Sequence, residues 1–369
     1  MTKKMMLWIL PLTLVSALAQ AQPTLTIRIL EKKNFSQVQC AEVKTVGWTE
    51  IKLSRGILTV NGKPRTSLRL GGEGGFHLKS SSFDRHYPGT LVVSRASDDR
   101  GKLLFINEVP FAQYVACVTA SESGFDESQP EYLKTLAVVV REYARGHLRR
   151  HTGYDLCDLA HCQVYQGTPP HFDFWEKIAA STEGFKSVSS PNSYYFHRCC
   201  GGVLESADQV WGGKSFDNTR KGPDEADGVV LCRSDPLFRW KTEVEVKKIA
   251  ATFQEMAGLP KGSLLTGCEV TEKTPQGRDK TLTASFNLPN GHSREVRENA
   301  GKFISEFGKR YGWRVFPSNW FEIKKEGEWF RFSGHGMGHG VGLCQSGALK
   351  LAQMGWSWRQ ILKFYFPKN

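Results

Sequence analysis

The chain has 369 residues, of which 40% are hydrophobic, and a formal net charge of +12. This length gives room for one large domain or two modest ones, and the apolar content excludes a largely disordered chain. The positive charge favours a partner with an anionic surface, such as wall polymers or lipid headgroups, although a basic surface kept only for solubility is an equal alternative.

The N-terminus has the three parts of a bacterial secretory signal peptide. Lys3 and Lys4 precede an uncharged apolar run at residues 5–18, and the small-residue sequence Ala19-Gln20-Ala21 follows. The run is too short to anchor the chain in a bilayer. We therefore expect residues 1–21 to be removed near Ala21/Gln22, and the mature protein to be periplasmic or secreted, without a membrane span. Export also argues against nucleic acid as a partner.

Residues 22–107 are predicted to form a β-rich N-terminal region. Short segments of alternating apolar and polar residues recur here, for example at residues 25–29 and 57–60, and Asn61-Gly62 is a strong hairpin signal.

Residues 108–240 are predicted to form the catalytic core. Glu122 follows an apolar, small-residue run at residues 115–121, and Ser128 and Glu131 have the spacing of a capping box that starts a long amphipathic helix. One face of this helix should be buried, and basic residues such as Arg141 should lie on the remaining surface. Its apolar positions recur at helical spacing: Leu133, Leu136, Ala137, Val140 and Ala144. Glu122 should therefore lie on rigid backbone, as a general acid requires, whereas Asp126 and Glu127 read as surface charges at the helix start.

Four potential metal ligands follow the helix within twelve residues: His151, Cys157, His161 and Cys162. Two thiolates and two imidazoles would complete a tetrahedral zinc site. The rival interpretation is a Cys157–Cys162 disulfide, which an exported protein permits. The chain has nine cysteines, and this odd number leaves at least one of them free or bound to metal.

Residues 241–330 are predicted to be a smaller, inserted α/β region. Helices are expected here over residues 241–256 and 299–311, with strands between residues 266 and 296, a hairpin at Asn290-Gly291 and two short strands around Gly327. A further short helix is expected over residues 172–183 of the preceding catalytic core.

The last region, residues 331–369, is predicted to complete the core. Its first part, residues 334–342, has glycine at every other position, so an extended backbone would place His335, Met337, His339 and Val341 on one face and leave the other face open to close approach. Helices are expected over residues 345–353 and 358–364, the latter capped by Ser357. The chain as a whole is thus predicted to have an α+β fold.

Three segments resemble the SpoIID/LytB family, the stage II sporulation protein D and its relatives. They are residues 114–143, with the sequence Ser121-Glu122 and the helix end VREYA; residues 154–165 (YDLCDLAHCQVY), followed by Phe196-His197, Gly201-Gly202 and Trp211; and residues 334–348 (GHGMGHGVGLCQSGA) with the C-terminal residues up to Pro367. There are departures from the family pattern. Ser123-Gly124 stands where Met-Pro is usual, Cys344 where serine is usual, and Cys199-Cys200 replace small polar residues.

The resemblance implies a lytic transglycosylase that cleaves the MurNAc-GlcNAc bond of peptidoglycan glycan strands, with 1,6-anhydroMurNAc as the product and Glu122 as the single acid/base. Its substrate would be strands that an amidase has stripped of stem peptides. The candidate sugar contacts are Gln163, Tyr165, His197, His335, His339 and Gln345, each of which could instead make a structural hydrogen bond. Relatives also hold a metal at residues matching the His/Cys cluster, which favours structural zinc as the one cofactor. The alternative function is a non-catalytic wall-binding protein that stimulates an amidase.

Overall fold

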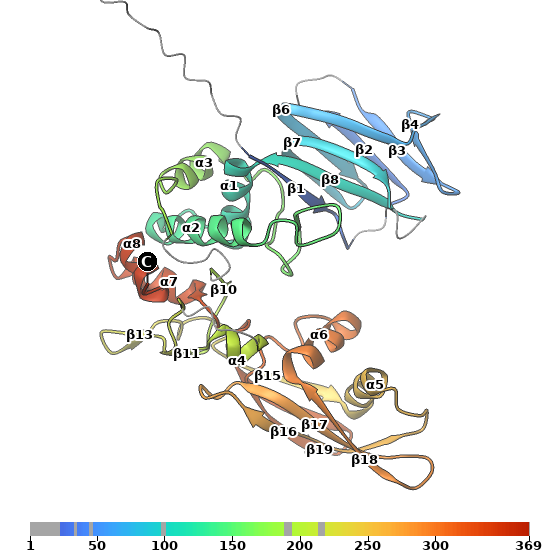
Figure 1. Cartoon of the computed structure of the whole chain (residues 1–369), viewed down its shortest axis with the longest axis vertical. Helices are drawn as coiled ribbons and strands as arrows, with labels where there is room; N and C mark the ends of the chain where they lie inside the picture. Colours follow the sequence, from blue (N-terminus) through green and yellow to red (C-terminus); the bar gives the residue numbers. More distant parts are fainter. Residues whose placement is uncertain are drawn as a thin grey trace, which may run out of the picture.

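The computed structural model describes residues 23–32, 35–43, 47–96, 101–187, 194–212 and 218–368. The predicted signal peptide, residues 1–21, and its cleavage position lie outside these ranges. Helices and strands are mixed along the chain, so the predicted α+β class is confirmed (Figure 1). In the described ranges, none of the helices combines the length and the apolar character needed to cross a bilayer.

The N-terminal part forms one large sheet of nine strands in the order β5-β4-β3-β2-β6-β7-β8-β1-β9. The alternation predicted for residues 25–29 is observed, since Leu25, Ile27 and Ile29 are buried. Every neighbouring pair is antiparallel except β1 and β9, and β9 comes from the segment that carries Cys157. The strands are β1 (Thr24–Ile29), β2 (Gln37–Glu42), β3 (Thr49–Ser54), β4 (Ile57–Val60), β5 (Lys63–Pro64), β6 (Ser67–Ser80), β7 (Phe83–Arg95), β8 (Leu103–Pro110) and β9 (Leu156–Cys157).

Helices beside the edge of this sheet form the centre of the first hydrophobic core (Figure 1). Helix α2 contacts four others, α1, α3, α7 and α8, and its predicted apolar face is fully buried. The helices of this part are α1 (Phe111–Glu122), α2 (Pro130–Gly146), α3 (Phe172–Ala180), α4 (Ala207–Trp211), α7 (Gln345–Gln353) and α8 (Trp358–Tyr365). Helices α7 and α8 match their predictions, and Ser357 and Gln360 form a capping box at the start of α8.

Two predictions for α2 are wrong. Its N-cap is Gln129, followed by Pro130, because the Ser128 amide donates to Asp126 and the Glu131 carboxylate binds Lys134 and the Trp358 amide. Arg141 is also not a surface charge. It is 3% exposed, because it donates to the carbonyl oxygens of Ala179 and Thr182 at the end of α3.

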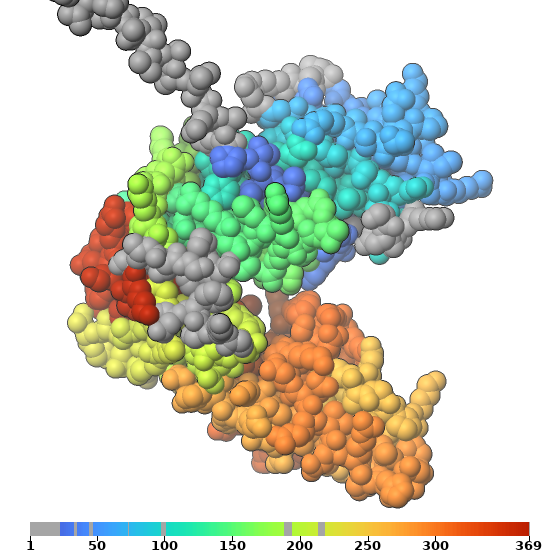
Figure 2. Space-filling view, viewed as in Figure 1, coloured from blue at the N-terminus to red at the C-terminus, as the bar shows by residue number. Residues whose placement is uncertain are grey.

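Residues from Trp240 to Phe332 contribute a second, separate hydrophobic core. They form a lobe that projects away from the N-terminal sheet (orange in Figures 1 and 2). Two three-stranded sheets, β15-β20-β19 and β16-β17-β18, are covered by two helices. The elements are β15 (Arg239–Glu245), α5 (Val246–Ala257), β16 (Leu264–Lys273), β17 (Asp279–Asn287), β18 (Ser293–Asn299), α6 (Ala300–Tyr311), β19 (Phe321–Glu326) and β20 (Trp329–His335). The helix predicted over residues 241–256 is wrong in its first part, where Trp240 and Val244 alternate with exposed residues in a strand.

The glycine-rich segment that follows β20 is not an extended strand. Gly336, Gly338, Gly340 and Gly342 all have positive φ, between 72° and 102°, so the backbone turns repeatedly and the predicted single face of side chains does not exist. The expected close approach does occur, because a Cβ on Gly342 would lie 2.1 Å from the Tyr195 carbonyl oxygen.

This segment interleaves with residues 196–205. Strand β10 (Phe196–His197) pairs in parallel with β21 (Leu343–Cys344), and single bridges join Cys199 to Met337 and Glu205 to Val341. Together with β10 and β21, two further two-stranded pairs belong to this part of the chain. They are β11 (Val203–Leu204) with β12 (Gly222–Pro223), and β13 (Glu225–Ala226) with β14 (Val229–Val230).

Candidate functional site

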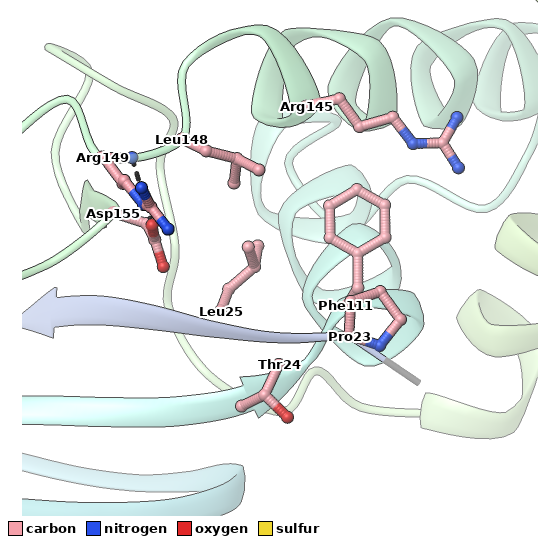
Figure 3. Close-up of a pocket in the computed structure, with 8 residues that line it drawn as sticks. All are labelled: Pro23, Thr24, Leu25, Phe111, Arg145, Leu148, Arg149 and Asp155. Atoms are coloured by element: carbon pink, nitrogen blue, oxygen red, sulfur yellow. Dashed lines mark hydrogen bonds between the residues drawn. The ribbon is translucent and has the colours of Figure 1, made fainter. Parts of the chain in front are cut away.

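A cleft of about 420 Å³ opens between β1, the start of α1 and the end of α2 (Figure 3). Asp155 is the only carboxylate among its lining residues. Its oxygens are occupied, because they accept hydrogen bonds from the backbone amides of Thr26 and Arg149. Asp155 therefore ties β1 to the loop after α2, and the geometry gives no free acid here.

A larger cleft of about 730 Å³ lies where α1, α2, the segment after β9 and the glycine-rich segment meet. It combines one carboxylate with imidazoles, guanidinium groups and four aromatic rings. Its lining residues are Glu122, Tyr143, His147, Arg150, Ala160, His161, Cys162, Val164, Tyr195, Phe196, His197, Arg198, Trp211, Met337, Gly338, His339 and Gln345. Among these described residues Glu122 is the only acid.

Helix α1 places Glu122 in this cleft. The run predicted only as rigid backbone is a helix that buries every residue from Tyr114 to Ser121, and Glu122 is its last residue. Its carbonyl oxygen accepts a hydrogen bond from Gln345 Nε2 at 3.1 Å, and its carboxylate accepts one from the Val164 amide at 2.7 Å. Residues from two other parts of the chain thus hold the backbone and the side chain of Glu122 in place.

Burial raises the pKa of Glu122 from its ordinary value of 4.5 to about 7, against the opposing effect of the Val164 amide. The position at the C-terminal end of α1 also disfavours a negative charge, because the partial charge of a helix is negative there. Glu122 can therefore hold a proton near neutral pH, as a general acid must.

Gln163 and Tyr165, predicted as sugar contacts, are buried and do not line the cleft. Gln163 accepts a hydrogen bond from Tyr114 Oη, and Tyr165 Oη donates to Asn107 Oδ1 at 2.6 Å. Their side chains alternate with the backbone amides of Val164 and Gln166, which point to the end of α1. Contrary to the prediction, Gln163 and Tyr165 therefore do not contact a ligand in the cleft but position the segment that binds the Glu122 carboxylate.

Of the four other predicted sugar contacts, three line the cleft and one does not. Gln345, His197 and His339 line the cleft, but His335 does not, because its ring stacks on Trp320 at 4.5 Å in the second lobe. Burial lowers the pKa of His197 and brings that of His339 to about 3, so both imidazoles are neutral.

His197 has one free ring nitrogen. Nδ1 donates to the Val341 carbonyl oxygen at 3.1 Å, and Nε2 has no partner among the described atoms. Because the imidazole is neutral, this buried Nε2 is a hydrogen-bond acceptor behind the cleft wall.

Sequence reasoning missed an aromatic wall. The Tyr195 and Trp211 rings lie 4.7 Å apart, His339 lies 4.9 Å from Trp211, and Trp211 is 51% exposed. Trp211 is part of the family resemblance, and an exposed tryptophan beside a cleft favours ligand contact. Tyr143 and Arg150 were also missed, and only their position at the end of α2 could have indicated them.

The four predicted metal ligands converge at the rim of this cleft. Their ligand atoms all lie within 4.8 Å of one another, with His151 Nε2 3.2 Å and His161 Nδ1 3.6 Å from Cys162 Sγ. Neither Cys157 nor Cys162 forms a disulfide. Two sulfurs and two imidazole nitrogens around one point are a donor set that fits tetrahedral zinc.

Comparison with known proteins agrees with the resemblance. Residues 99–187 match the family described as SpoIID: Stage II sporulation protein. The chain is 27% identical to an uncharacterized protein of Brachyspira hyodysenteriae over 76% of this chain and 70% of that protein. It is 38% identical to the amidase enhancer of Bacillus subtilis, over 24% of this chain and 12% of that protein.

A third relative is the stage II sporulation protein D of Bacillus amyloliquefaciens. Its identity to this chain is 24%, over 76% of this chain and 77% of the relative. The domain match at residues 99–187 includes Glu122, Val164 and the His/Cys cluster. Residues 99–187 of the chain therefore carry a domain of the stage II sporulation protein (SpoIID) family, and the longer likeness to stage II sporulation protein D agrees with it.

Proposed function

We propose that the protein is a lytic transglycosylase that cleaves peptidoglycan glycan strands, with Glu122 as its only acid/base. The observation that carries this proposal is one carboxylate with a raised pKa in a cleft whose other described residues include no acid. An ordinary glycosidase needs two carboxylates, one for the leaving oxygen and one to activate water or form a covalent intermediate. When a hydroxyl group of the same sugar attacks C1, no water has to be activated and one carboxylate is enough.

The steps balance without water. Glu122 donates its proton to the oxygen that joins MurNAc C1 to GlcNAc, and the bond between C1 and this oxygen breaks. The 6-hydroxyl of the same MurNAc attacks C1 and forms the 1,6-anhydro bond, and its proton passes to the Glu122 carboxylate. The enzyme thereby regains its starting protonation state, so a single group of pKa near 7 serves both transfers.

The wall of the cleft supports a carbohydrate ligand. The exposed Trp211 ring and its neighbour Tyr195 offer flat apolar surfaces for sugar rings, and the polar side chain of Gln345 lies in the same cleft. Aromatic walls with a few placed polar groups are typical of ligand sites.

We also propose that His151, Cys157, His161 and Cys162 hold a structural zinc ion. The segment that follows Cys162 carries the Val164 amide, so the ion would brace the group that binds the Glu122 carboxylate. Elemental analysis should find about one zinc ion fewer in Cys162→Ser than in the wild type. Equal zinc contents, or a Cys157–Cys162 disulfide in a peptide map of the wild type, would exclude this site.

The protein would act in the periplasm or outside the cell, where peptidoglycan lies. Its net charge of +12 suits an anionic wall. The likeness to an amidase enhancer supports a working partnership with an amidase, which would supply glycan strands without stem peptides.

Digestion of purified naked glycan strands, without any partner protein, tests the activity. Mass spectrometry should find products that end in anhydromuramic acid, lighter by one water than the products of a lysozyme. Reducing ends of full mass would instead indicate hydrolysis and a second catalytic carboxylate.

A second candidate function is stimulation of an amidase without cleavage, which the amidase-enhancer likeness at 38% identity favours. Here the protein should raise the release of stem peptides by an added amidase, and Glu122→Gln should do so equally well. Intact glycan strands in the digestion above, together with this stimulation, would favour the second function over the first.

A further inference from the structure

A second cluster of potential metal ligands lies in the core, away from the His/Cys cluster. Cys200, Asp224, Cys232 and Cys344 are all buried, and their ligand atoms lie within 4.8 Å of one another. The four come from separate segments: the turn after β10, the loop between β12 and β13, the turn after β14, and the end of β21. Only the tertiary structure brings them together.

The distances are those of ligands around a common ion and not those of a disulfide. Cys200 Sγ lies 3.4 Å from Cys232 Sγ and 3.0 Å from Asp224 Oδ2. A disulfide has a sulfur–sulfur distance of about 2.0 Å. Two thiolates on a tetrahedral zinc ion, each about 2.3 Å from it, lie about 3.8 Å apart.

Neighbouring groups orient the ligands. The Cys200 amide donates to Cys344 Sγ, and the Gly202 amide donates to Cys200 Sγ, both at 3.3 Å. Hydrogen bonds of this kind stabilise negative charge on sulfur. Tyr365 Oη donates to Asp224 Oδ1 at 3.0 Å, which leaves Oδ2 directed at the sulfurs. Metal-binding carboxylates are commonly held in this way.

The glycine at position 347 makes room for this arrangement. A Cβ there would lie 2.2 Å from Tyr365 Oη and 2.7 Å from Asp224 Oδ2. Any side chain at this position of α7 would therefore displace the pair that orients the carboxylate.

A metal cation would offset the negative charge that the cluster carries when its thiols and its carboxyl group are deprotonated. In the part of the chain that the structure describes, no lysine, arginine or histidine forms an ion pair with Asp224, and buried anionic groups are costly unless they are paired or bind a metal. The buried Arg278 guanidinium donates to the Cys200 carbonyl oxygen at 2.8 Å and offsets part of the negative charge.

We propose that Cys200, Asp224, Cys232 and Cys344 bind a second structural zinc ion. Three thiolates and one carboxylate around a closed, buried point suit tetrahedral Zn²⁺ and leave no position open for a substrate. The ion would fasten strands β12 to β14, which are only two residues each, to the end of β21 and so to the glycine-rich segment that lines the cleft.

Native mass spectrometry of the intact chain, purified without a metal-binding tag, tests the proposal directly. We expect about two zinc ions in the wild type and about one in Cys162→Ser, in which the first cluster is broken. Cys232→Ser should also lose about one ion, whereas Cys268→Ser, at a cysteine outside both clusters, should lose none.

Cobalt substitution of Cys162→Ser gives a readout that does not need a variant of the second cluster to fold. Thiolate-to-cobalt absorption in this protein should have the intensity of about three sulfur ligands. Loss of all bound metal in Cys162→Ser would overturn the proposal. So would a disulfide between any two of Cys200, Cys232 and Cys344 in a non-reducing peptide map of the wild type, or iron–sulfur absorption in the purified protein.

Discussion

At the scale of a single residue, two opposing effects determine the pKa of Glu122. Burial raises the pKa of its carboxyl group, and the hydrogen bond from the Val164 amide lowers it, but burial is the larger effect. Other carboxylates nearby do not share this environment. Asp126 is exposed, and the Ser128 amide lowers its pKa, whereas Glu127 binds His171 at the surface.

This contrast predicts the effect of removing the acid. Glu122→Gln keeps the size of the side chain and an acceptor for the Val164 amide but has no proton to donate. General acid–base assistance typically raises a reaction rate by roughly a hundred- to ten-thousand-fold. The rate of glycan cleavage by Glu122→Gln should therefore fall by a factor of at least about a hundred, while glycan binding persists. Asp126→Asn and Glu127→Gln should cleave at nearly the wild-type rate. The assignment fails if Glu122→Gln releases anhydromuramic products as fast as the wild type.

The same carboxyl group should make the stability depend on pH. Its pKa is 4.5 before folding and about 7 in the folded protein, so the folded state binds more protons between these values and the free energy of unfolding falls as the pH rises. The loss is complete above pH 7 and amounts to up to roughly 3 kcal/mol. Glu122→Gln removes it, so this variant should have a higher midpoint of thermal unfolding than the wild type at pH 8 and a similar one at pH 4. Glu127→Gln should show no such difference, and a lower midpoint for Glu122→Gln at pH 8 would contradict the raised pKa.

At the scale of elements, the glycine-rich segment determines the wall of the cleft. Its glycines serve two needs, a backbone with positive φ and close contact with neighbouring chain. Gly342 has φ of 75° and would place a Cβ 2.1 Å from the Tyr195 carbonyl oxygen, whereas Gly355 has φ of 87° and no atom near the corresponding position. A substitution at Gly355 therefore reports the cost of backbone strain alone, whereas a substitution at Gly342 reports backbone strain together with steric crowding.

Alanine at each position measures the difference. Gly355→Ala should lower the free energy of unfolding by about 1–2 kcal/mol, the usual cost of positive φ for a residue with a Cβ. Gly342→Ala should lose clearly more and should also impair glycan cleavage, because Tyr195 in the cleft wall must move. Thermal unfolding and the glycan digestion provide the two measurements. Equal losses at the two positions would mean that crowding contributes nothing.

At the scale of the whole molecule, Arg278 ties the second lobe to the cleft. It is 1% exposed, and it donates to the carbonyl oxygens of Cys200 at 2.8 Å and Gly338 at 3.2 Å. Gly340 approaches it so closely that a Cβ there would lie 2.4 Å from the guanidinium group. The second lobe thus bears directly on the segment that carries His339.

Replacement of this arginine should loosen the cleft without unfolding the second lobe. Arg278→Met keeps an apolar stem but leaves the buried carbonyl oxygen of Cys200 without its donor, at a cost of about 1–3 kcal/mol, and removes the donor of the half-buried Gly338 carbonyl oxygen. Amide hydrogen exchange should accelerate in residues 336–342 and remain slow in α6, and glycan cleavage should fall. Arg331→Met is the matched control in the same lobe, because its exposed ion pairs with Glu243 and Glu326 contribute about 0–1 kcal/mol each. Unchanged exchange in residues 336–342 would show that Arg278 does not support this segment.

Much of the architecture could be predicted from local patterns. The apolar face of α2, the capped helices α6 and α8, the hairpin at Asn290-Gly291 and the mixed α+β class depend on residues close together in the chain, whose periodicity and turn chemistry act locally. The His/Cys cluster could be found for the same reason, since its four members lie within twelve residues.

What the sequence alone determined was therefore the family resemblance, most of the elements and the candidate acid. The tertiary structure decided which polar side chains face the cleft. Gln163 and Tyr165 are turned into the core by Tyr114 and Asn107, partners about fifty residues away that no local pattern reveals. The raised pKa of Glu122 and the second cysteine cluster have the same origin, because burial and convergence depend on how distant segments pack together.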